Sequence, residues 1–274
     1  MLKHEEIERN LITKYRKDIW RKFSKAVKEY DLVSENDKIA VCISGGKDSF
    51  ILAKLMEELQ KHGDKKFDLV YLVMNPGYTK EVVKMIKKNA KILNLDICLF
   101  DSDIFKVTEK ISKEAPCYLC ARMRRGVLYK KAQELGCNKI ALGHHFDDVI
   151  ETVLMSVLYG GEFKSMPPKL HSTNFKGMEL IRPLYLIREK DIIKFCKSNN
   201  LKFIDCACTV TSKSTLKDSK RLEIKELIEK MEKENPLIPS NIFASTINTN
   251  IDTLLGYKTN GKEVSFTEKY QDNE

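Results

Sequence analysis

No stretch of this sequence offers about 18 uncharged apolar residues in a row, so we expect no helix that crosses a membrane and no membrane partner. Residues 1–6 lack the apolar core of a secretion signal, which favours a cytoplasmic protein. Internal repeats, low-complexity linkers and the G-x-x-x-x-G-K-[ST] loop of kinases and GTPases are absent as well. The 274 residues, 42% of them hydrophobic, are enough for one large domain with additions.

Apolar runs of strand length alternate with longer amphipathic runs between residues 38 and 159. Strands are predicted at residues 38–43, 69–74, 97–100 and 139–142, and helices at residues 48–62, 80–94, 117–135 and 146–159. This order predicts an α/β fold, a doubly wound parallel sheet with helices on both faces. Such sheets bind ligands beyond the carboxyl ends of their strands.

Helical extensions are expected on both sides of this core. Residues 7–30 are predicted to form one amphipathic helix with an apolar stripe at Ile12, Ile19, Phe23 and Val27. The core is followed by a breaker-rich loop at 160–177, a short strand near 180–181, and helices at 189–198 and 214–234. Pro236 and Pro239 interrupt the chain, and residues 258–274 form a polar, frayed tail. We divide the chain into an N-terminal segment (1–34), a core (35–212) and a C-terminal extension (213–274).

The most informative motif follows the first predicted strand and opens the next helix: Ser44, Gly45, Gly46, Lys47, Asp48 and Ser49. Its two glycines let the backbone close around an anion, and the exposed N–H groups of the helix complete a nest for phosphate. Lys47 adds a positive charge, and Asp48 is placed to hold Mg²⁺ on the phosphates. An ordinary strand-to-helix turn is the alternative interpretation.

A second polar motif, residues 143–152, lies at the end of a later predicted strand and opens the following helix. Asp147 and Asp148 suit the positive N-terminus of that helix. They could serve only as helix caps, or belong to a His–Asp phosphohydrolase site, which would need further ligands elsewhere. Because parallel strands end at one edge of a sheet, we expect this motif to meet the glycine motif.

The eight cysteines are expected to be thiols or metal ligands in a reducing cytoplasm. Four are interpreted as buried small side chains or receive no function: Cys42, Cys98, Cys137 and Cys196. Cys117 and Cys120 form a C-x-x-C at the start of a helix, with Arg124 on the same helical face. Zinc, an iron–sulfur cluster, a redox dithiol and no function all stay open for this pair. With Cys206 and Cys208, four thiolates suit a structural zinc ion, and three suit an iron–sulfur cluster with one open iron.

Together these motifs carry a resemblance to a known family. The glycine motif and residues 143–152 resemble the N-type ATP pyrophosphatases, which split ATP into AMP and pyrophosphate. The stretches CYLCARMRRGVLYKKAQELG, KIALGHHFDDVIETVL and IRPLYLIREKDI are similar to tRNA 2-thiocytidine synthetases, which thiolate a cytidine in the tRNA anticodon loop. The similarity runs from about residue 9 to about residue 205. It departs at the distal cysteines, where the family has a second C-x-x-C followed by Gly-Ser-Gln and this chain has Cys206-Ala207-Cys208.

The resemblance implies a set of site residues. ATP with Mg²⁺ binds the glycine motif together with Gly143 and His144. The catalytic residues that match the family's positions are Lys47, Asp48, Arg124 and Asp147. A [4Fe–4S] cluster is held by Cys117, Cys120 and Cys206, with Cys208 as the alternative third ligand.

The expected activity is that of an ATP-dependent tRNA sulfurtransferase, which adenylates the C2 oxygen of a pyrimidine, cytidine by resemblance, and replaces it with sulfur. Sulfide or the persulfide of a cysteine desulfurase would be the sulfur donor, and a homodimer is compatible with the sequence. A net charge of +9 suits a polyanionic partner, and we expect Lys14, Arg21 and Lys25 to contact tRNA phosphates. A merely solvated helix face is the alternative for these three residues.

Other functions stay open at this point. The same adenylation could serve amine attack, as in lysidine formation, or 2-thiouridine formation. A non-catalytic iron–sulfur redox sensor on nucleic acid is the alternative from another class. The paired cysteines argue against amination, and the intact glycine motif argues against a sensor, which has no need to grip pyrophosphate.

Overall fold

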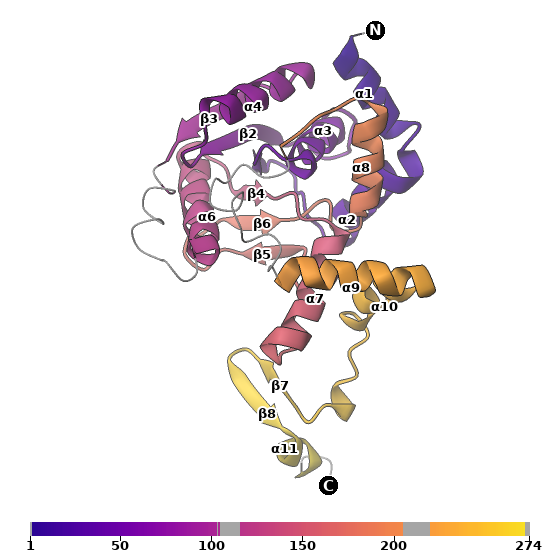
Figure 1. Ribbon diagram of the computed structural model, residues 1–274. Coiled ribbons are helices and arrows are strands. Elements are labelled where there is room, and N and C mark those ends of the chain that lie inside the picture. Colours follow the sequence, from indigo (N-terminus) through magenta and orange to yellow (C-terminus); the bar gives the residue numbers. More distant parts are fainter. Residues whose placement is uncertain (1, 103, 105–115, 205–219, 272–274) are drawn as a thin grey trace.

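The structure, a computed structural model, describes residues 2–102, 104, 116–204 and 220–271. Its centre is a six-stranded sheet in the order β3-β2-β1-β4-β6-β5 (Figure 1). The strands are β1 (Lys38–Cys42), β2 (Asp68–Asn75), β3 (Ile97–Asp101), β4 (Lys139–Ala141), β5 (Lys169–His171) and β6 (Glu179–Ile181). All neighbours pair in parallel except β5, which lies antiparallel to β6 at one edge, within residues that we expected to be loop.

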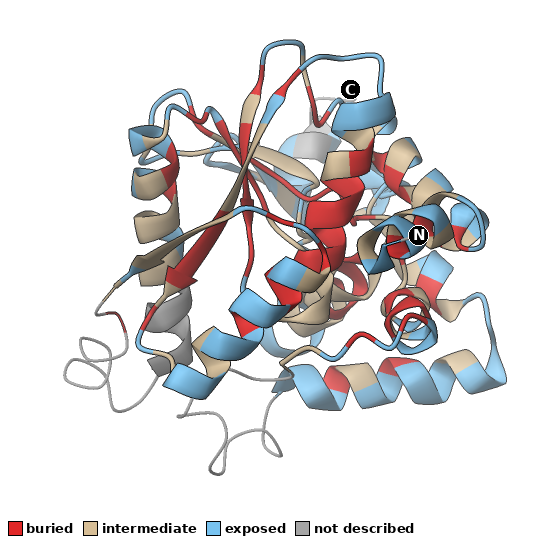
Figure 2. Ribbon diagram, turned by 90° about the horizontal axis from the view of Figure 1, so that it is seen from above, coloured by how far each residue is buried: buried red, intermediate tan, exposed pale blue. Residues whose placement is uncertain are grey.

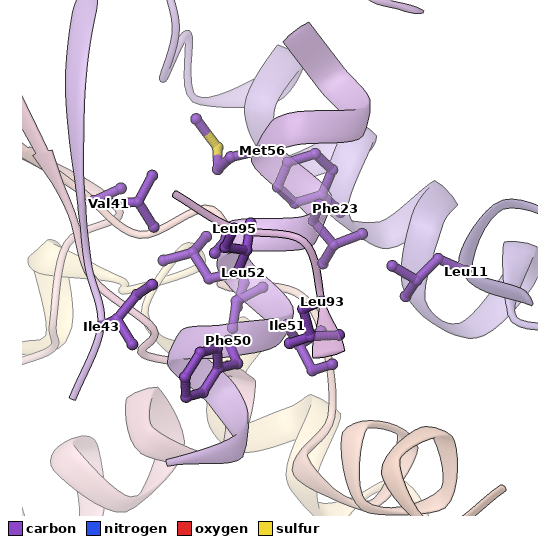
Figure 3. Packing of buried hydrophobic residues seen from close by; sticks show 14 of the residues in the cluster. Leu11, Phe23, Val41, Ile43, Phe50, Ile51, Leu52, Met56, Leu93 and Leu95 are labelled. Atoms are coloured by element: carbon purple, nitrogen blue, oxygen red, sulfur yellow. The ribbon is translucent and has the colours of Figure 1, made fainter. Parts of the chain in front are cut away.

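Helices cover both faces of the sheet, because alternate residues of a buried strand point to opposite sides. In β1, Ile39 and Val41 face the larger core, which α3 (Lys47–His62), α4 (Lys80–Ile92) and α8 (Glu189–Ser198) complete; Figure 3 shows part of it. Ala40 and Cys42 face a smaller core under α6 (Pro116–Glu134). Buried residues accordingly gather along the strands and on the inner sides of the helices (Figure 2). The predicted doubly wound α/β fold is confirmed.

The strand order places a topological switch point between β1 and β4. The chain leaves β1 through α3 toward β2, whereas β4 leads into α7 (Phe146–Gly160) on its way to the other half of the sheet. Two helices of the C-terminal extension, α9 (Lys220–Glu234) and α10 (Ile238–Ser245), pack on α7. A crevice for ligands is expected at such a point, beyond the carboxyl ends of the two strands.

The single N-terminal helix predicted over residues 7–30 is wrong. The structure has α1 (Lys3–Ile12), a π-helical turn η1 (Arg16–Trp20) and α2 (Arg21–Glu29). The wider turn begins where the Tyr15 N–H reaches back to the carbonyl of Asn10. It lets the Tyr15 hydroxyl bond Ser198 on α8 at 2.8 Å, while the ring packs edge-on against Phe195. A tertiary contact therefore replaces regular helix, although the predicted apolar stripe does face the core.

The frayed tail predicted from residue 258 is wrong as far as Gln271. Strands β7 (Gly256–Thr259) and β8 (Lys262–Ser265) form a hairpin, and the helix α11 (Phe266–Gln271) follows it. Asn260 and Gly261 occupy the turn with φ of 49° and 76°, the left-handed conformation that a two-residue hairpin requires. Before the hairpin lies a short 3₁₀ turn, η2 (Ile251–Thr253). In the described part of the chain, no helix is long and apolar enough to cross a membrane.

Candidate active site

The glycine loop (residues 44–49) joins β1 to α3 and is shaped to receive an anion. Gly45 has φ of +98°, and a Cβ there would lie 3.1 Å from Ile86 and 3.2 Å from Ile204. The Ser49 hydroxyl fixes the turn, donating to the Gly46 carbonyl at 2.9 Å and accepting from the Ser44 N–H at 3.1 Å. No side chain caps the N-terminus of α3 at Gly46. The N–H groups of its first turn are therefore available for phosphate oxygens.

Lys47 and Asp48 provide opposite charges at the start of α3. The Lys47 ammonium donates to Glu189 on α8 at 2.7 Å and lies 3.2 Å from Oδ2 of Asp48. Burial is the largest influence on Asp48 and raises its pKa, against the lowering effects of His145 and Lys47. Its other oxygen, Oδ1, is buried and finds no hydrogen-bond partner among the described residues. An unsatisfied carboxylate oxygen beside a phosphate nest fits a ligand for Mg²⁺.

The loop after β4 touches the glycine loop, as we expected. A Cβ on Gly143 would lie 3.1 Å from the Ser49 nitrogen and 3.2 Å from the carbonyl carbon of Asp48, tighter than ordinary contact, so glycine favours this close approach. Burial lowers the pKa of the next residue, His144, to about 4. Its imidazole is neutral at neutral pH, and Nδ1 has no hydrogen-bond partner within the described chain. The two sequence motifs thus form one site at the switch point.

The two aspartates that follow have different roles. Asp148 caps α7: its carboxylate accepts the His145 N–H at 2.9 Å, and the His145 imidazole accepts the Asp148 N–H at 3.3 Å. Asp147 caps nothing on its own helix. It accepts the Arg188 Nε–H at 2.9 Å and the Glu189 N–H, at the start of α8, at 2.6 Å. The capping interpretation therefore holds for Asp148, whereas Asp147 ties α7 to α8.

An ion-pair network around the site was missed by the sequence reasoning. Glu189 bridges Lys47 and Lys225 of α9, the latter at 2.6 Å, and hydrogen bonds from these lysines lower its pKa to about 2 although burial alone would raise it. Arg221, also on α9, binds Asp148 at 3.1 Å and Glu151 at 2.8 Å. Arg188 and Glu189 belong to the stretch IRPLYLIREKDI, which carried the resemblance, but the basic residues of α9 gave no signal beyond a charged helix.

The helix with the C-x-x-C reaches the same edge. Arg124 of α6 donates to the Tyr78 hydroxyl at 3.3 Å, and this hydroxyl lies 3.4 Å from the Ser44 carbonyl. Cys117 and Cys120 lie in the first turns of α6, seven and four residues before Arg124 respectively. Cys206 and Cys208 lie outside the described residues. The described chain before them ends at Ile204, whose N–H points to the Gly45 carbonyl at 3.4 Å, and resumes at the start of α9 beside the Arg221 contacts.

The three basic residues expected at the RNA lie outside this crevice. Lys14, Arg21 and Lys25 are exposed on the N-terminal segment. The helix that carries Arg21 and Lys25 nevertheless borders the site, because Lys22 of α2 binds Asp191 in the first turn of α8 at 2.9 Å. Among the cysteines left without a function, burial raises the pKa of Cys42 and Cys196 to about 12 each, which makes both thiols unreactive.

The class of the protein is that of α/β proteins with a glycine nest for phosphate at the switch point of a mostly parallel sheet. A family model described as a PP-loop domain matches residues 15–214. A curated relative from Coxiella burnetii, named tRNA-cytidine(32) 2-sulfurtransferase, is 39% identical over 238 residues, which are 85% of this chain and 90% of the relative. A relative of the same name from Alcanivorax borkumensis is 36% identical over 88% of this chain and 84% of its own. The chain belongs to this tRNA-cytidine(32) 2-sulfurtransferase family of PP-loop proteins, which confirms the resemblance.

A solved structure supports the fold. The U34-tRNA thiolase NcsA from Methanococcus maripaludis, described with its [4Fe–4S] cluster, matches with a TM-score of 0.65 at 24% sequence identity. The match covers 82% of this chain and 77% of NcsA.

Proposed function

We propose that the protein is an ATP-dependent tRNA sulfurtransferase that adenylates the C2 oxygen of a cytidine in the anticodon loop and replaces that oxygen with sulfur. The observation that carries the proposal is the contact between the glycine loop and the loop after β4, where a Cβ on Gly143 would lie only 3.1–3.3 Å from the backbone of Asp48 and Ser49. This contact sets a phosphate nest beside a second polar loop from another strand. The names of the curated relatives support tRNA as the substrate.

ATP would place its β- and γ-phosphates in the glycine loop, held by the N–H groups of α3 and by Lys47. Although burial lowers the pKa of Lys47, its carboxylate neighbours Asp48 and Glu189 raise it, so the ammonium stays charged for this task. Mg²⁺ would bind Asp48, a role supported by the unpartnered Oδ1. The metal would neutralise charge on the leaving pyrophosphate.

The chain's own residues then hold the reacting groups. The C2 oxygen of the base attacks the α-phosphorus, the bond to the bridging oxygen breaks, and pyrophosphate leaves. Lys47 stabilises the charge that grows on the phosphate oxygens. Asp147 keeps the start of α8, and with it Glu189, in position against Lys47. In the second step sulfide adds to C2, AMP leaves with the oxygen, and the sulfide proton is lost.

The cluster ligands that we propose are Cys117, Cys120 and Cys206, with Cys208 as the alternative to Cys206. Two placements favour them: Arg124 of α6 reaches the glycine loop through Tyr78, and Ile204, two residues before Cys206, contacts Gly45. A [4Fe–4S] cluster with one iron free of protein ligands would supply a binding position for sulfide. The sulfur donor would be sulfide or a desulfurase persulfide, and we expect Lys14, Arg21 and Lys25 to bind tRNA backbone.

The test is pyrophosphate release and product mass with purified protein, ATP, sulfide and unmodified tRNA. Release that depends on tRNA, together with a sulfur-for-oxygen mass change confined to a cytidine, supports the proposal. A mass change on uridine would make uridine the modified base, and addition of a lysine would assign amination instead of thiolation. Tight tRNA binding without any pyrophosphate release would favour the redox sensor and refute the enzyme.

A further inference from the structure

Two arginines beyond the nucleotide loops have no carboxylate partner among the described residues. Arg182 follows β6 and is 6% exposed, yet Nε of its guanidinium has no hydrogen-bond partner in that part of the chain. Its other end is anchored, because Nη1 donates to the Pro167 carbonyl. Arg125 is exposed on α6 and close enough for its charge to act on Arg182; together with burial it lowers the pKa of Arg182 to about 10.

Two other arginines of the same edge do have carboxylate partners. Arg188 binds Asp147 and Glu232, and Arg221 binds Asp148 and Glu151. A buried guanidinium that keeps an unsatisfied N–H beside a second cation is costly unless an anion completes it. The guanidinium fork matches phosphate oxygens in particular.

We propose that Arg182 and Arg125 bind a backbone phosphate of the RNA substrate next to the base that is modified. The inference rests on the proposed function. RNA is favoured over ATP by position: β6 lies two strands from β1, about 10 Å at the usual strand spacing, whereas the glycine loop and Lys47 already serve the ATP phosphates. Strand β4 lies between β1 and β6, and the loop after it carries His144. Because the C2 oxygen must reach the α-phosphate, we expect the phosphates that flank the base to lie on the side away from the glycine loop, toward Arg182 and its exposed neighbour Arg125.

The test compares three single variants and one double variant in binding to anticodon stem–loop RNA. Arg125→Gln removes an exposed charge and is expected to weaken binding about tenfold. It should also reduce the slope of log affinity against log salt by about 0.7. Arg182→Lys keeps the charge but loses the fork, so it should weaken binding with an unchanged salt slope. Lys130→Gln is the control, since it removes one charge from the same helix about 140° around its axis and should change little.

Two further measurements test whether the arginines share one phosphate. If both hold the same phosphate, Arg125→Gln combined with Arg182→Lys should lose less affinity than the product of the single effects. Affinity for ATP, measured without RNA, should be the same in all variants. If Arg182→Lys does not fold, Arg125→Gln still decides, because its side chain is exposed.

The inference is overturned if Arg125→Gln matches Lys130→Gln in RNA affinity and salt slope. Weaker ATP binding with RNA binding unchanged would also overturn it, by assigning the arginines to the nucleotide. Failure of the proposed function is a different result, seen in the wild-type protein: no tRNA-dependent pyrophosphate release, or release without a sulfur-for-oxygen exchange, whatever the arginine variants do to RNA affinity.

Discussion

Replacing Asp48 by asparagine is expected to abolish catalysis without loss of stability. The carboxylate is partly buried, its Oδ1 is buried and unsatisfied within the described residues, and burial raises its pKa. A buried acceptor without a partner costs about 1–3 kcal/mol, and the Lys47 ammonium at 3.2 Å offsets part of this cost. We therefore expect the free energy of unfolding of Asp48→Asn to equal that of the wild type or to exceed it by up to about 2 kcal/mol.

Asp147 provides the matched control, a carboxylate at the same edge with both oxygens satisfied. It accepts from Arg188 at 2.9 Å and from the Glu189 N–H at 2.6 Å. Hydrogen bonds to charged groups contribute about 1.5–3 kcal/mol, so Asp147→Asn should lower the free energy of unfolding by about 2 kcal/mol. The same change from aspartate to asparagine is therefore expected to keep or raise the free energy of unfolding at position 48 and to lower it at position 147.

The pH dependence of the difference follows from linkage. The pKa of Asp48 is higher in the folded than in the unfolded protein, so the penalty of its charge is fully present above the folded pKa. It disappears as the pH falls below the unfolded pKa, where both states hold the proton. The advantage of Asp48→Asn should therefore be largest near neutral pH and shrink in acid.

Urea unfolding followed by the fluorescence of Trp20, the single tryptophan, measures these stabilities, and tRNA-dependent pyrophosphate release measures activity. Lys47→Ala should share the loss of activity while it remains folded. The reasoning is refuted if Asp48→Asn is destabilised as much as Asp147→Asn, or if Asp48→Asn keeps near-normal turnover.

Three other expectations concern different parts of the molecule. Glu189→Gln should lose about 2 kcal/mol of stability at neutral pH, after a discount for partial exposure, because the pKa of Glu189 is lowered to about 2. The stability that ionised Glu189 contributes should vanish as the pH falls from about 4.5 toward 2. Equal urea midpoints of wild type and variant at neutral pH would contradict this expectation. Reversing Lys14, Arg21 and Lys25 to glutamate should weaken tRNA binding with little change in melting temperature, and unchanged affinity at physiological salt would reject the RNA contact. Under anaerobic purification Cys206→Ala should lose the cluster and Cys208→Ala should keep it; the reverse pattern would exchange the ligands, and loss in both would argue against an open iron.

The sequence allowed the parallel strands and both loops to be predicted, because their signals are local, whereas the antiparallel edge strand β5 was taken for loop. Apolar runs mark the strands, and glycine is favoured where the backbone adopts φ of +98°, as at Gly45, or where a Cβ would be tightly packed, as at Gly143. The Asn260-Gly261 turn was local too, and we misjudged it as part of a frayed tail although it is a strong hairpin signal.

The ion-pair network could not be predicted in this way. Glu189 meets Lys47 across 142 positions of sequence, and Lys225 joins them from a helix that reads as a solvated, charged surface. A charged residue on a helix has the same local pattern whether it faces water or a carboxylate of another element. The π-helical turn at Tyr15 has the same cause, since its reason is a contact with α8. The cluster ligands stay a prediction, because Cys206 and Cys208 lie outside the described residues.

Two groups left unsatisfied among the described residues lie at opposite ends of the site. Oδ1 of Asp48, after β1, can accept a cation, and Nε of Arg182, after β6, can donate to an anion. Between them Asp147 and Asp148 are each bound by an arginine. Adenylation of an RNA base needs both kinds of partner: Mg²⁺ on the pyrophosphate that leaves and a fixed grip on the nucleic acid that attacks. The two strand spacings between β1 and β6, about 10 Å, would then set the separation of leaving group and acceptor backbone, with the α-phosphate between them.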